Sequence, residues 1–392
     1  MVNITGQNGR DNGIRPSDDR LRELLHGYAK NRMKLDERKL YLEKEGYTIS
    51  VAKLKKLNRE FGVPTVRKPP PLPVATTTVS TIMSKDLAAR NGPNTIQHIL
   101  RRQHNCYVPR DTIRRIARKI FPHGSEARYP GKKAPTLRMG VSIDIYGARC
   151  HTSGVVLLDE VVPNARCSST IGHLYLDMVE KYGVISEQIT VDGGTETGEL
   201  YACHKALRDK YKPEWKDSPA HPEFVSIPST KNVIIEGHWN HWLRFAGSSL
   251  REAIEQGRIG GYFVIGNEVH KNLFHWLWPR IVQRSLDDFI EYWNNHPTRN
   301  HRRGNLPSGV RPQLVYDFPE HFGLYNCGIR VDQEDIQVLR ATIPRSREEC
   351  FRWVPDEFDV AAQLAYGQLG EPELTSTSGW QVFVDMLQIL SV

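Results

Sequence analysis

The spacing of the apolar residues changes near residue 139, and this change constrains the fold more than any other feature of the sequence. Before that point apolar side chains recur with the period of an α-helix, as at Leu21, Leu24 and Leu25. After it, "MGVSIDIYGARC" and "GVVLLDEVV" alternate with period 2, which is typical of two strands joined by a turn at 151–154. The sequence therefore predicts a helical front half and a back half that opens with a strand hairpin.

The segments that follow the hairpin favour an α/β fold. "IGHLYLDMVEKYG" has the pattern of an amphipathic helix, and "ISEQITVDGG" that of a short buried strand ending in a turn. A hairpin, a helix and a further strand are the beginning of an α/β domain rather than of a helical bundle. Further on, "EVHKNLFHWLWPRIVQRSLDDFIEYWNNH" predicts a long aromatic-rich helix, and "REECFRWV" and "GWQVFVDMLQIL" predict short helices in the tail.

The two halves of the chain carry opposite charge. Residues 1–140 hold 29 Lys and Arg against 12 Asp and Glu, a balance of +17. The whole chain holds 53 basic and 45 acidic residues, so residues 141–392 hold 24 against 33, a balance of −9. This asymmetry indicates a front half that binds a polyanion and a back half with a different task.

The basic half contains a candidate helix-turn-helix at residues 17–68. In "EGYTIS", Gly46 can end one helix and Ser50 can cap the next. The second helix then exposes Lys53, Lys56 and Arg59 on the side away from its apolar residues, as a helix in a DNA major groove would.

A second helical basic region is predicted at residues 85–138. Pro93 lies near a helix start and Asp111 in the first turn of another helix. Residues 69–84 are rich in proline and predict a linker that is not helical, and residues 1–16 predict a disordered end. Basic residues on the last predicted helix could contact DNA or could form an ordinary solvated face; they are Arg110, Arg114, Arg115 and Arg118.

Composition excludes several classes of protein. No apolar run approaches the roughly 18 residues of a membrane span, and the N-terminus lacks the pattern of a signal peptide. The six cysteines include no C-x-x-C pair, which argues against a zinc ribbon and against a disulfide framework. We therefore expect a protein of a reducing compartment without membrane partners.

Three carboxylates are candidates for chemistry. Asp192 ends a predicted strand beside two glycines, at the rim where α/β proteins build sites. Glu236 begins a helix in "STKNVIIEGHWNHW", and Asp144 lies on an early strand. Two divalent ions held by such oxygen ligands could stabilise the attacking and leaving oxygens of a phosphoryl transfer. Each residue also has a plainer interpretation: Asp192 as a turn cap, Glu236 as a favourable charge at a helix start, Asp144 as a surface residue.

These segments resemble the integrase core proteins of transposon origin found in fungi and other eukaryotes, which are related to retroviral integrases and DDE transposases. The resemblance rests on "ITVDGGTETGEL", "STKNVIIEGHWNHW" and "FIEYWNNHPTRNHRRGNLPSGVRP" and covers residues 139–320 best. It is weaker in the helical front half and in the tail, 321–392.

The resemblance implies an RNase H-like core with a mixed sheet and DNA strand transfer that depends on Mg²⁺ or Mn²⁺. By motif, Asp192 matches the second acid of the family and Glu236 the third, and Lys231 and Asn232 lie where relatives approach DNA. Homo-oligomerisation and residence in the nucleus are further expectations.

The sequence departs from the family at the first acid. Relatives carry it in a Trp-x-x-Asp-Gly-His-x-Lys-Leu segment, whereas "SEARYPGKKAPTLRMG" has no Asp and no clear strand. Asp144, on the following strand, is the candidate substitute. The sequence leaves open an active integrase, an inactive domesticated DNA-binding protein with the same fold, and a metal-dependent nuclease of that fold.

Overall fold

The computed structural model describes residues 12–122, 142–228, 232–300 and 306–390. The chain divides into two compact units. Unit 1 comprises residues 1–84 and 91–128, and unit 2 comprises residues 85–90 and 129–392. Unit 1 is helical and unit 2 combines helices with three small strand pairs, so the chain is a mixed, helix-rich α/β protein.

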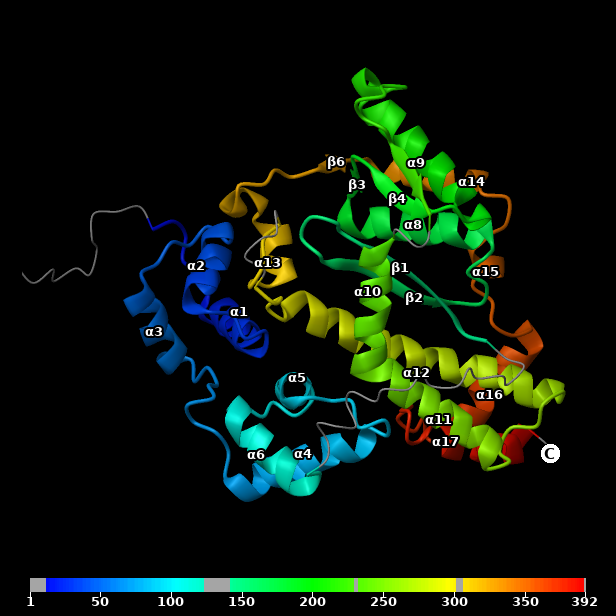
Figure 1. Ribbon diagram of the computed structural model, residues 1–392, viewed down its shortest axis with the longest axis horizontal. Helices are drawn as coiled ribbons and strands as arrows, with labels where there is room; N and C mark the ends of the chain where they lie inside the picture. Colours follow the sequence, from blue (N-terminus) through cyan, green and yellow to red (C-terminus); the bar gives the residue numbers. More distant parts are fainter. Residues whose placement is uncertain (1–11, 123–141, 229–231, 301–305, 391–392) are drawn as a thin grey trace, which may run out of the picture. The chain divides into compact units, whose positions relative to one another are not determined.

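Unit 1 begins with three helices, and the last two are the pair that the sequence predicts on either side of the turn at Gly46. They are α1 Asp18–Lys30, α2 Leu35–Lys44 and α3 Val51–Glu60 (Figure 1). Gly46, with φ of +79°, follows the end of α2, and the Ser50 hydroxyl accepts a hydrogen bond from the backbone amide of Lys53 at 3.2 Å. The predicted turn and cap are therefore confirmed. Their apolar faces meet in one cluster that includes Leu21, Leu25, Leu42, Leu54 and Leu57.

The expectation of disorder up to residue 16 is wrong for the part that the structure describes. Gly13 forms a β-bridge with Tyr47, and the Ile14 amide donates to the Gly46 carbonyl at 3.0 Å. Gly13 has φ of +69°, and a Cβ there would lie 2.0 Å from that carbonyl oxygen. A glycine is required because the backbone of the preceding segment runs directly against the turn between α2 and α3.

The expectation of a non-helical linker at 69–84 is also wrong, because α4 spans Leu72–Lys85. The four prolines of "PPPLP" lie before the helix or in its first turn, where a missing N–H costs nothing. Ala75, Val79 and Ile82 then follow at helical spacing and are buried. The threonines are tolerated because their hydroxyls donate to carbonyls one turn back, as from Thr78 to Val74 at 2.8 Å.

Two further helices complete unit 1. They are α5 Pro93–Gln103, with Pro93 at its start, and α6 Arg110–Ile120, with Asp111 in its first turn, as predicted. The buried side chains of α4, α5 and α6 form one cluster, so the second group of helices begins at residue 72 rather than at 85. The two groups touch within the unit, where Arg102 donates to the side-chain oxygen of Asn31 at 3.1 Å.

Unit 2 contains three two-stranded pairs. The predicted hairpin is present as β1 Asp144–Arg149 and β2 Val156–Val162, which are antiparallel. The strand expected at 187–192 is present in shortened form, and a separate strand precedes it. β3 Val184–Ser186 pairs with β6 Gly328–Arg330, and β4 Ile189–Asp192 pairs in parallel with β5 Phe224–Ile227. Within the described residues these pairs are not joined into one sheet.

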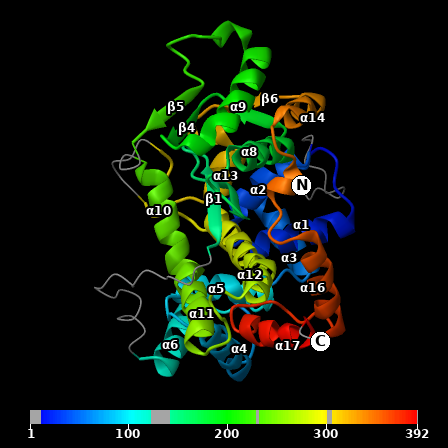
Figure 2. The same cartoon turned by 90° about the vertical axis from the view of Figure 1, so that its right-hand side faces the viewer.

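Helices cover both faces of the β1–β2 pair (Figure 1, Figure 2). On one face Tyr146, Leu158 and Val162 pack with helix α8 Ser168–Tyr182. On the other, Ile145 and Val161 pack with helix α12 Glu268–Asn295, the long helix that the sequence predicts. The remaining helices of unit 2 are α9 Gly198–Tyr211, α10 Val233–Trp242, α11 Ser248–Ile259, α13 Pro312–Asp317, α14 Gln333–Thr342, α15 Arg347–Cys350, α16 Asp356–Gln368 and α17 Gly379–Leu390.

The outer edge of β2 is hydrogen-bonded by side chains of α12 rather than by another strand. The Asn294 amide group accepts from the Val156 N–H at 2.9 Å and donates to the Val156 carbonyl at 3.0 Å. Gln283 accepts from the Val161 N–H at 2.9 Å and donates to the Asp159 carbonyl at 3.1 Å. Two amide side chains thus satisfy the backbone groups that a neighbouring strand would satisfy.

The tail beyond residue 320 is helical, as predicted, but it is part of unit 2. β6 pairs with β3, residues of α14 join the cluster around α8, and residues of α16 and α17 join the cluster around α12. In the described part of the chain, no helix combines the length and the apolar character that crossing a bilayer requires.

Candidate functional site

Asp192 is the last residue of β4, as predicted. The backbone turns at Gly193 and Gly194, where the Gly194 amide donates to the Asp192 carbonyl at 2.8 Å, and α9 begins four residues later. The Asp192 side chain is half-buried and has no hydrogen-bond or ion-pair partner among the residues that the structure describes. Its carboxylate is therefore available to a cation or a donor from outside the chain.

A second carboxylate, Glu196, lies near Asp192. Its side chain folds back over Gly194, since a Cβ at Gly194 would lie 1.9 Å from Glu196 Oε1. Both acids act on Tyr146 of β1: burial first, then the charges of Glu196 and Asp192, raise the pKa of the phenol to about 12. The end of β4 and the middle of β1 are thus close together. Glu196 and Tyr146 are missed by the sequence reasoning, although the motif "DGGTET" contains the first.

Glu236 lies in the first turn of α10, where the sequence predicts it. The residue is exposed, and within the described segments its carboxylate makes no hydrogen bond or ion pair. The packing face of α10 predicted from Ile235, Trp239 and Trp242 is confirmed in part. All three are half-buried; Trp239 lies against Gly147 of β1, and Trp242 packs on the apolar cluster around α12. The fully buried residue of the helix, His238, is not among them.

His238 attaches α10 to the β1–β2 pair. Its Nε2 lies 2.9 Å from both carboxylate oxygens of Asp159 on β2, and both side chains are inaccessible to solvent. Gly147, the β1 residue opposite Asp159, makes room for this contact. A Cβ at Gly147 would lie 2.5 Å from Asp159 Oδ1 and 2.7 Å from the indole of Trp239. The position of Glu236 thus depends on a buried His–Asp contact two residues further along its helix.

Asp144 does not lie with the other two candidates as a ligand set. It is the first residue of β1, and its Oδ2 accepts a hydrogen bond from the Ala165 backbone amide at 3.1 Å. Among residues 12–122, 142–228, 232–300 and 306–390, no three His, Cys, Asp or Glu side chains are grouped closely enough to hold one metal ion. Asp192, Glu236 and Asp144 therefore do not form one three-carboxylate group within the described residues.

The predicted basic surfaces of unit 1 are solvent-exposed. Lys53, Lys56 and Arg59 project from α3. On α6 all four predicted arginines are exposed, and the Arg110 guanidinium donates to the Asn94 side chain at 2.8 Å. Lys53, Lys56, Arg114, Arg115 and Arg118 form no ion pair with any described residue.

Of the two DNA contacts predicted beside α10, Lys231 and Asn232, the structure describes only Asn232. Asn232 directly precedes the helix, and its carbonyl accepts from the Glu236 amide at 3.2 Å. Lys231 lies outside the described residues. The basic and polar residues named in the sequence analysis therefore lie on α3, on α6 and before α10.

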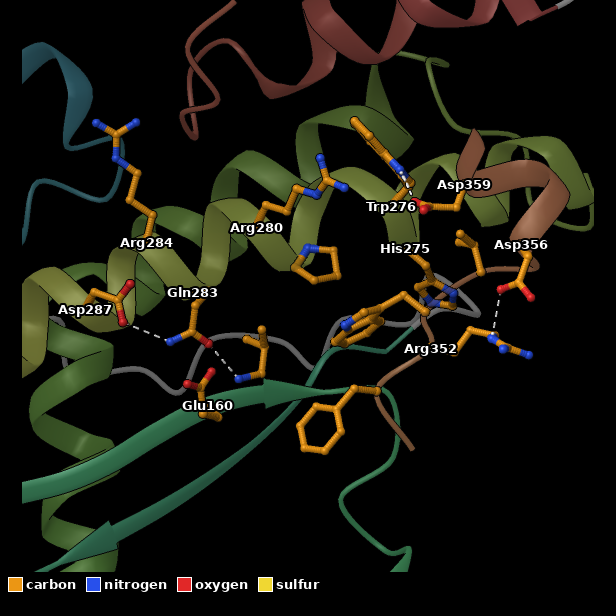
Figure 3. A pocket seen from close by; sticks show the side chains of 15 residues that line it. Glu160, His275, Trp276, Arg280, Gln283, Arg284, Asp287, Arg352, Asp356 and Asp359 are labelled. Carbon is orange, nitrogen blue, oxygen red and sulfur yellow. Dashed lines mark hydrogen bonds and ion pairs between the residues drawn. The ribbon is translucent and has the colours of Figure 1, made fainter. Parts of the chain in front are cut away.

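A pocket of about 480 Å³ lies elsewhere in unit 2, between β2, α12 and the segment leading into α16 (Figure 3). Arg280 covers the ring of Trp276 at 3.6 Å, and the Trp276 N–H donates to Asp359 at 2.8 Å. Glu160 of β2 faces the pocket, and burial, followed by the charges of Asp287 and Asp177, raises the pKa of its carboxyl to about 7. No sequence pattern indicated this pocket.

Comparisons with protein-family models, with curated proteins and with solved structures gave no significant match to this chain.

Proposed function

We propose that this protein binds DNA through the helices of unit 1. The observation that carries the proposal is the group of three arginines on α6, Arg114, Arg115 and Arg118, which are exposed and have no acidic partner among the described residues. Exposed basic side chains that lack internal partners can neutralise phosphates and release counterions, which supplies most of the affinity for nucleic acid.

The arrangement of α2 and α3 supports the same function. The two helices are joined by a tight turn, and Lys53, Lys56 and Arg59 lie on the exposed side of the second one. A recognition helix placed after such a turn enters the major groove in helix-turn-helix proteins. Lys231 and Asn232 are proposed as additional contacts from the other unit.

The test is a salt-dependent binding measurement with the full chain and a fluorescent 30-base-pair duplex of random sequence. The variant Arg114→Gln/Arg115→Gln/Arg118→Gln should lose at least about 10-fold in affinity, and the slope of log K against log[salt] should fall by about 2 to 3. The control removes the same charge at three exposed, acid-paired residues of unit 2, Arg258→Gln/Lys271→Gln/Arg284→Gln. Equal affinities for the two triple variants would contradict the proposal.

A second candidate function is DNA strand transfer by an RNase H-like core of integrase descent. It is favoured by Asp192 and Glu236, two carboxylates that the family motifs match and that lack partners in the described structure. On this proposal Mg²⁺ or Mn²⁺ is the cofactor, Asp144 is the least suited of the three acids, and the protein works as a homo-oligomer in the nucleus.

Strand transfer is tested with full-length protein, Mn²⁺ and a labelled duplex end. Joined products that disappear with Asp192→Asn would support an integrase, and degraded products alone would support a nuclease. Binding without either product would leave the first proposal, a DNA-binding protein, as the function.

A further inference from the structure

Two cysteines from distant parts of the sequence lie together in unit 2. Cys167 is the residue that caps the N-terminus of α8, and Cys350 is the last residue of α15. The two thiols are close enough to interact electrostatically, and the buried Thr170 side chain interacts with both. A third neighbour is basic: Arg345 Nη1 lies 3.9 Å from Cys167 Sγ.

The segment that carries Cys350 is fastened to α8 beside these thiols. His173 of α8 forms a hydrogen bond through Nε2 with the Arg345 carbonyl at 2.8 Å. Arg347 of α15 makes an ion pair with Asp177 of α8 at 3.0 Å. Two contacts on the N-terminal side of Cys350 therefore attach its segment to α8.

The surroundings of the two thiols differ in a way that assigns them different roles. Burial would raise the pKa of the Cys167 thiol, but hydrogen bonds from the Thr170 hydroxyl and from the backbone amides of Thr170 and Ser169, with the charge of Arg345, outweigh it and lower the pKa. Cys350 is 4% exposed, and burial raises its pKa. Cys167, which is half-exposed, is thus the more reactive nucleophile. Cys350 is buried near it and is the thiol that can react with oxidised Cys167.

We propose that Cys167 and Cys350 form an oxidisable dithiol that hydroperoxides convert into an intramolecular disulfide. In the first step the Cys167 thiolate attacks one oxygen of hydrogen peroxide, the O–O bond breaks, and after proton uptake the products are a sulfenic acid and water. In the second step Cys350 attacks the sulfur of the sulfenic acid, the S–O bond breaks, and a second water leaves. Overall two thiols are oxidised by two electrons and one peroxide is reduced.

The disulfide would tie α15 to the N-terminus of α8 and add a covalent link to a contact that is otherwise made by ion pairs and hydrogen bonds. In a reducing compartment such a bond forms transiently and reports oxidation. The inference does not depend on DNA binding or on strand transfer.

The experiment uses the full-length reduced protein, treated with hydrogen peroxide and then with N-ethylmaleimide, and analysed by mass spectrometry before and after digestion. We expect four alkylated cysteines instead of six, a loss of about 2 Da before alkylation, and a linked peptide pair containing Cys167 and Cys350 that dithiothreitol separates. Cys350→Ser should abolish the link and leave a sulfenic acid at Cys167 that dimedone traps. Cys167→Ser should abolish both products, whereas the control Cys327→Ser should retain the link.

A second measurement uses the wild type alone, so that its result does not depend on whether the variants fold. At pH 7 iodoacetamide should label Cys167 at least about 10-fold faster than Cys327, a half-exposed thiol whose pKa burial raises. The proposal is overturned if all six thiols stay free at a peroxide dose that oxidises free cysteine, if another pair is linked, or if Cys167 and Cys327 are labelled equally fast.

Discussion

One imidazole nitrogen of His238 on α10 lies 2.9 Å from both carboxylate oxygens of Asp159 on β2, and neither side chain reaches solvent. The pair joins a helix to a strand 79 positions away in sequence. Since Glu236 lies two residues before His238, this contact determines where that candidate carboxylate projects.

Breaking the pair should destabilise unit 2. Asp159→Ala removes the carboxylate that accepts from His238 and leaves the buried imidazole without a hydrogen-bond partner there. We therefore expect a loss of about 3 kcal/mol in the free energy of unfolding measured in urea. Asp356→Ala, at an exposed carboxylate of the same unit, should change it by less than about 0.5 kcal/mol. In a double-mutant cycle, His238→Ala should add little to Asp159→Ala; additive losses would mean that the two side chains do not act together.

Gly147 should tolerate no side chain. Gly147→Ala places a methyl group 2.5 Å from Asp159 Oδ1 and 2.7 Å from Trp239, so we expect a loss of about 2 kcal/mol in the thermal or urea unfolding of unit 2. Gly237→Ala is the matched control, because its Cβ meets nothing within 4 Å and it lies inside α10. That variant should be stabilised by about 0.5 to 1 kcal/mol. The same sign for both substitutions would show that β1 yields easily at this position.

Glu160 should make stability depend on pH. Its folded pKa of about 7 is above the ordinary value of 4.5, so the native state holds the proton more tightly than the unfolded state. Protonated Glu160 therefore contributes to the free energy of unfolding, fully below about pH 4.5, and this contribution is lost as the pH rises towards 7. Glu160→Gln removes this pH dependence. Between pH 5 and 8 the free energy of unfolding of wild type should therefore fall by on the order of 1 kcal/mol relative to that of the variant, after allowance for solvent screening. A constant difference over this range would be inconsistent with a raised pKa.

The helix α4 should contribute to the stability of unit 1. Ile82 is 4% exposed, and Ile82→Ala should cost about 2 to 4 kcal/mol, measured by hydrogen exchange of the α4–α6 amides in the full chain. Val74→Ala, at a side chain that is 52% exposed on the same helix, should change exchange little. If Ile82→Ala were equally neutral, the segment would behave as the linker that its prolines suggest.

Local signals predicted much of this structure. The Ser50 cap, the β1–β2 hairpin, the long α12 and the place of Asp192 at a strand end all follow from spacing and turn chemistry, which act within a few residues. The linker expectation at 69–84 is wrong because proline content alone does not show where in a helix the prolines fall. A helix tolerates proline in its first turn, and the buried residues at 75, 79 and 82 were the stronger signal.

The spacing of residues along the sequence does not predict contacts between residues that are far apart in the chain. The partner of His238 is 79 positions away, and no spacing rule links an imidazole on a helix to an aspartate on a strand. Glu196 was visible in "DGGTET", but its nearness to Tyr146 depends on how β1 and β4 are packed. The expectation for Asp144 rests on the order of the acids along the chain and on the resemblance; alternation assigns it a face of a strand but not its neighbours.

The amide side chains of Gln283 and Asn294 have a consequence for self-association. A strand edge whose backbone groups are already hydrogen-bonded cannot template the addition of another chain. With the outer edge of β2 closed in this way, the β1–β2 pair offers at most its β1 edge to a second molecule. Another strand could add to the outer edge of β2 only by displacing these two amide side chains, so α12 blocks strand addition at that edge.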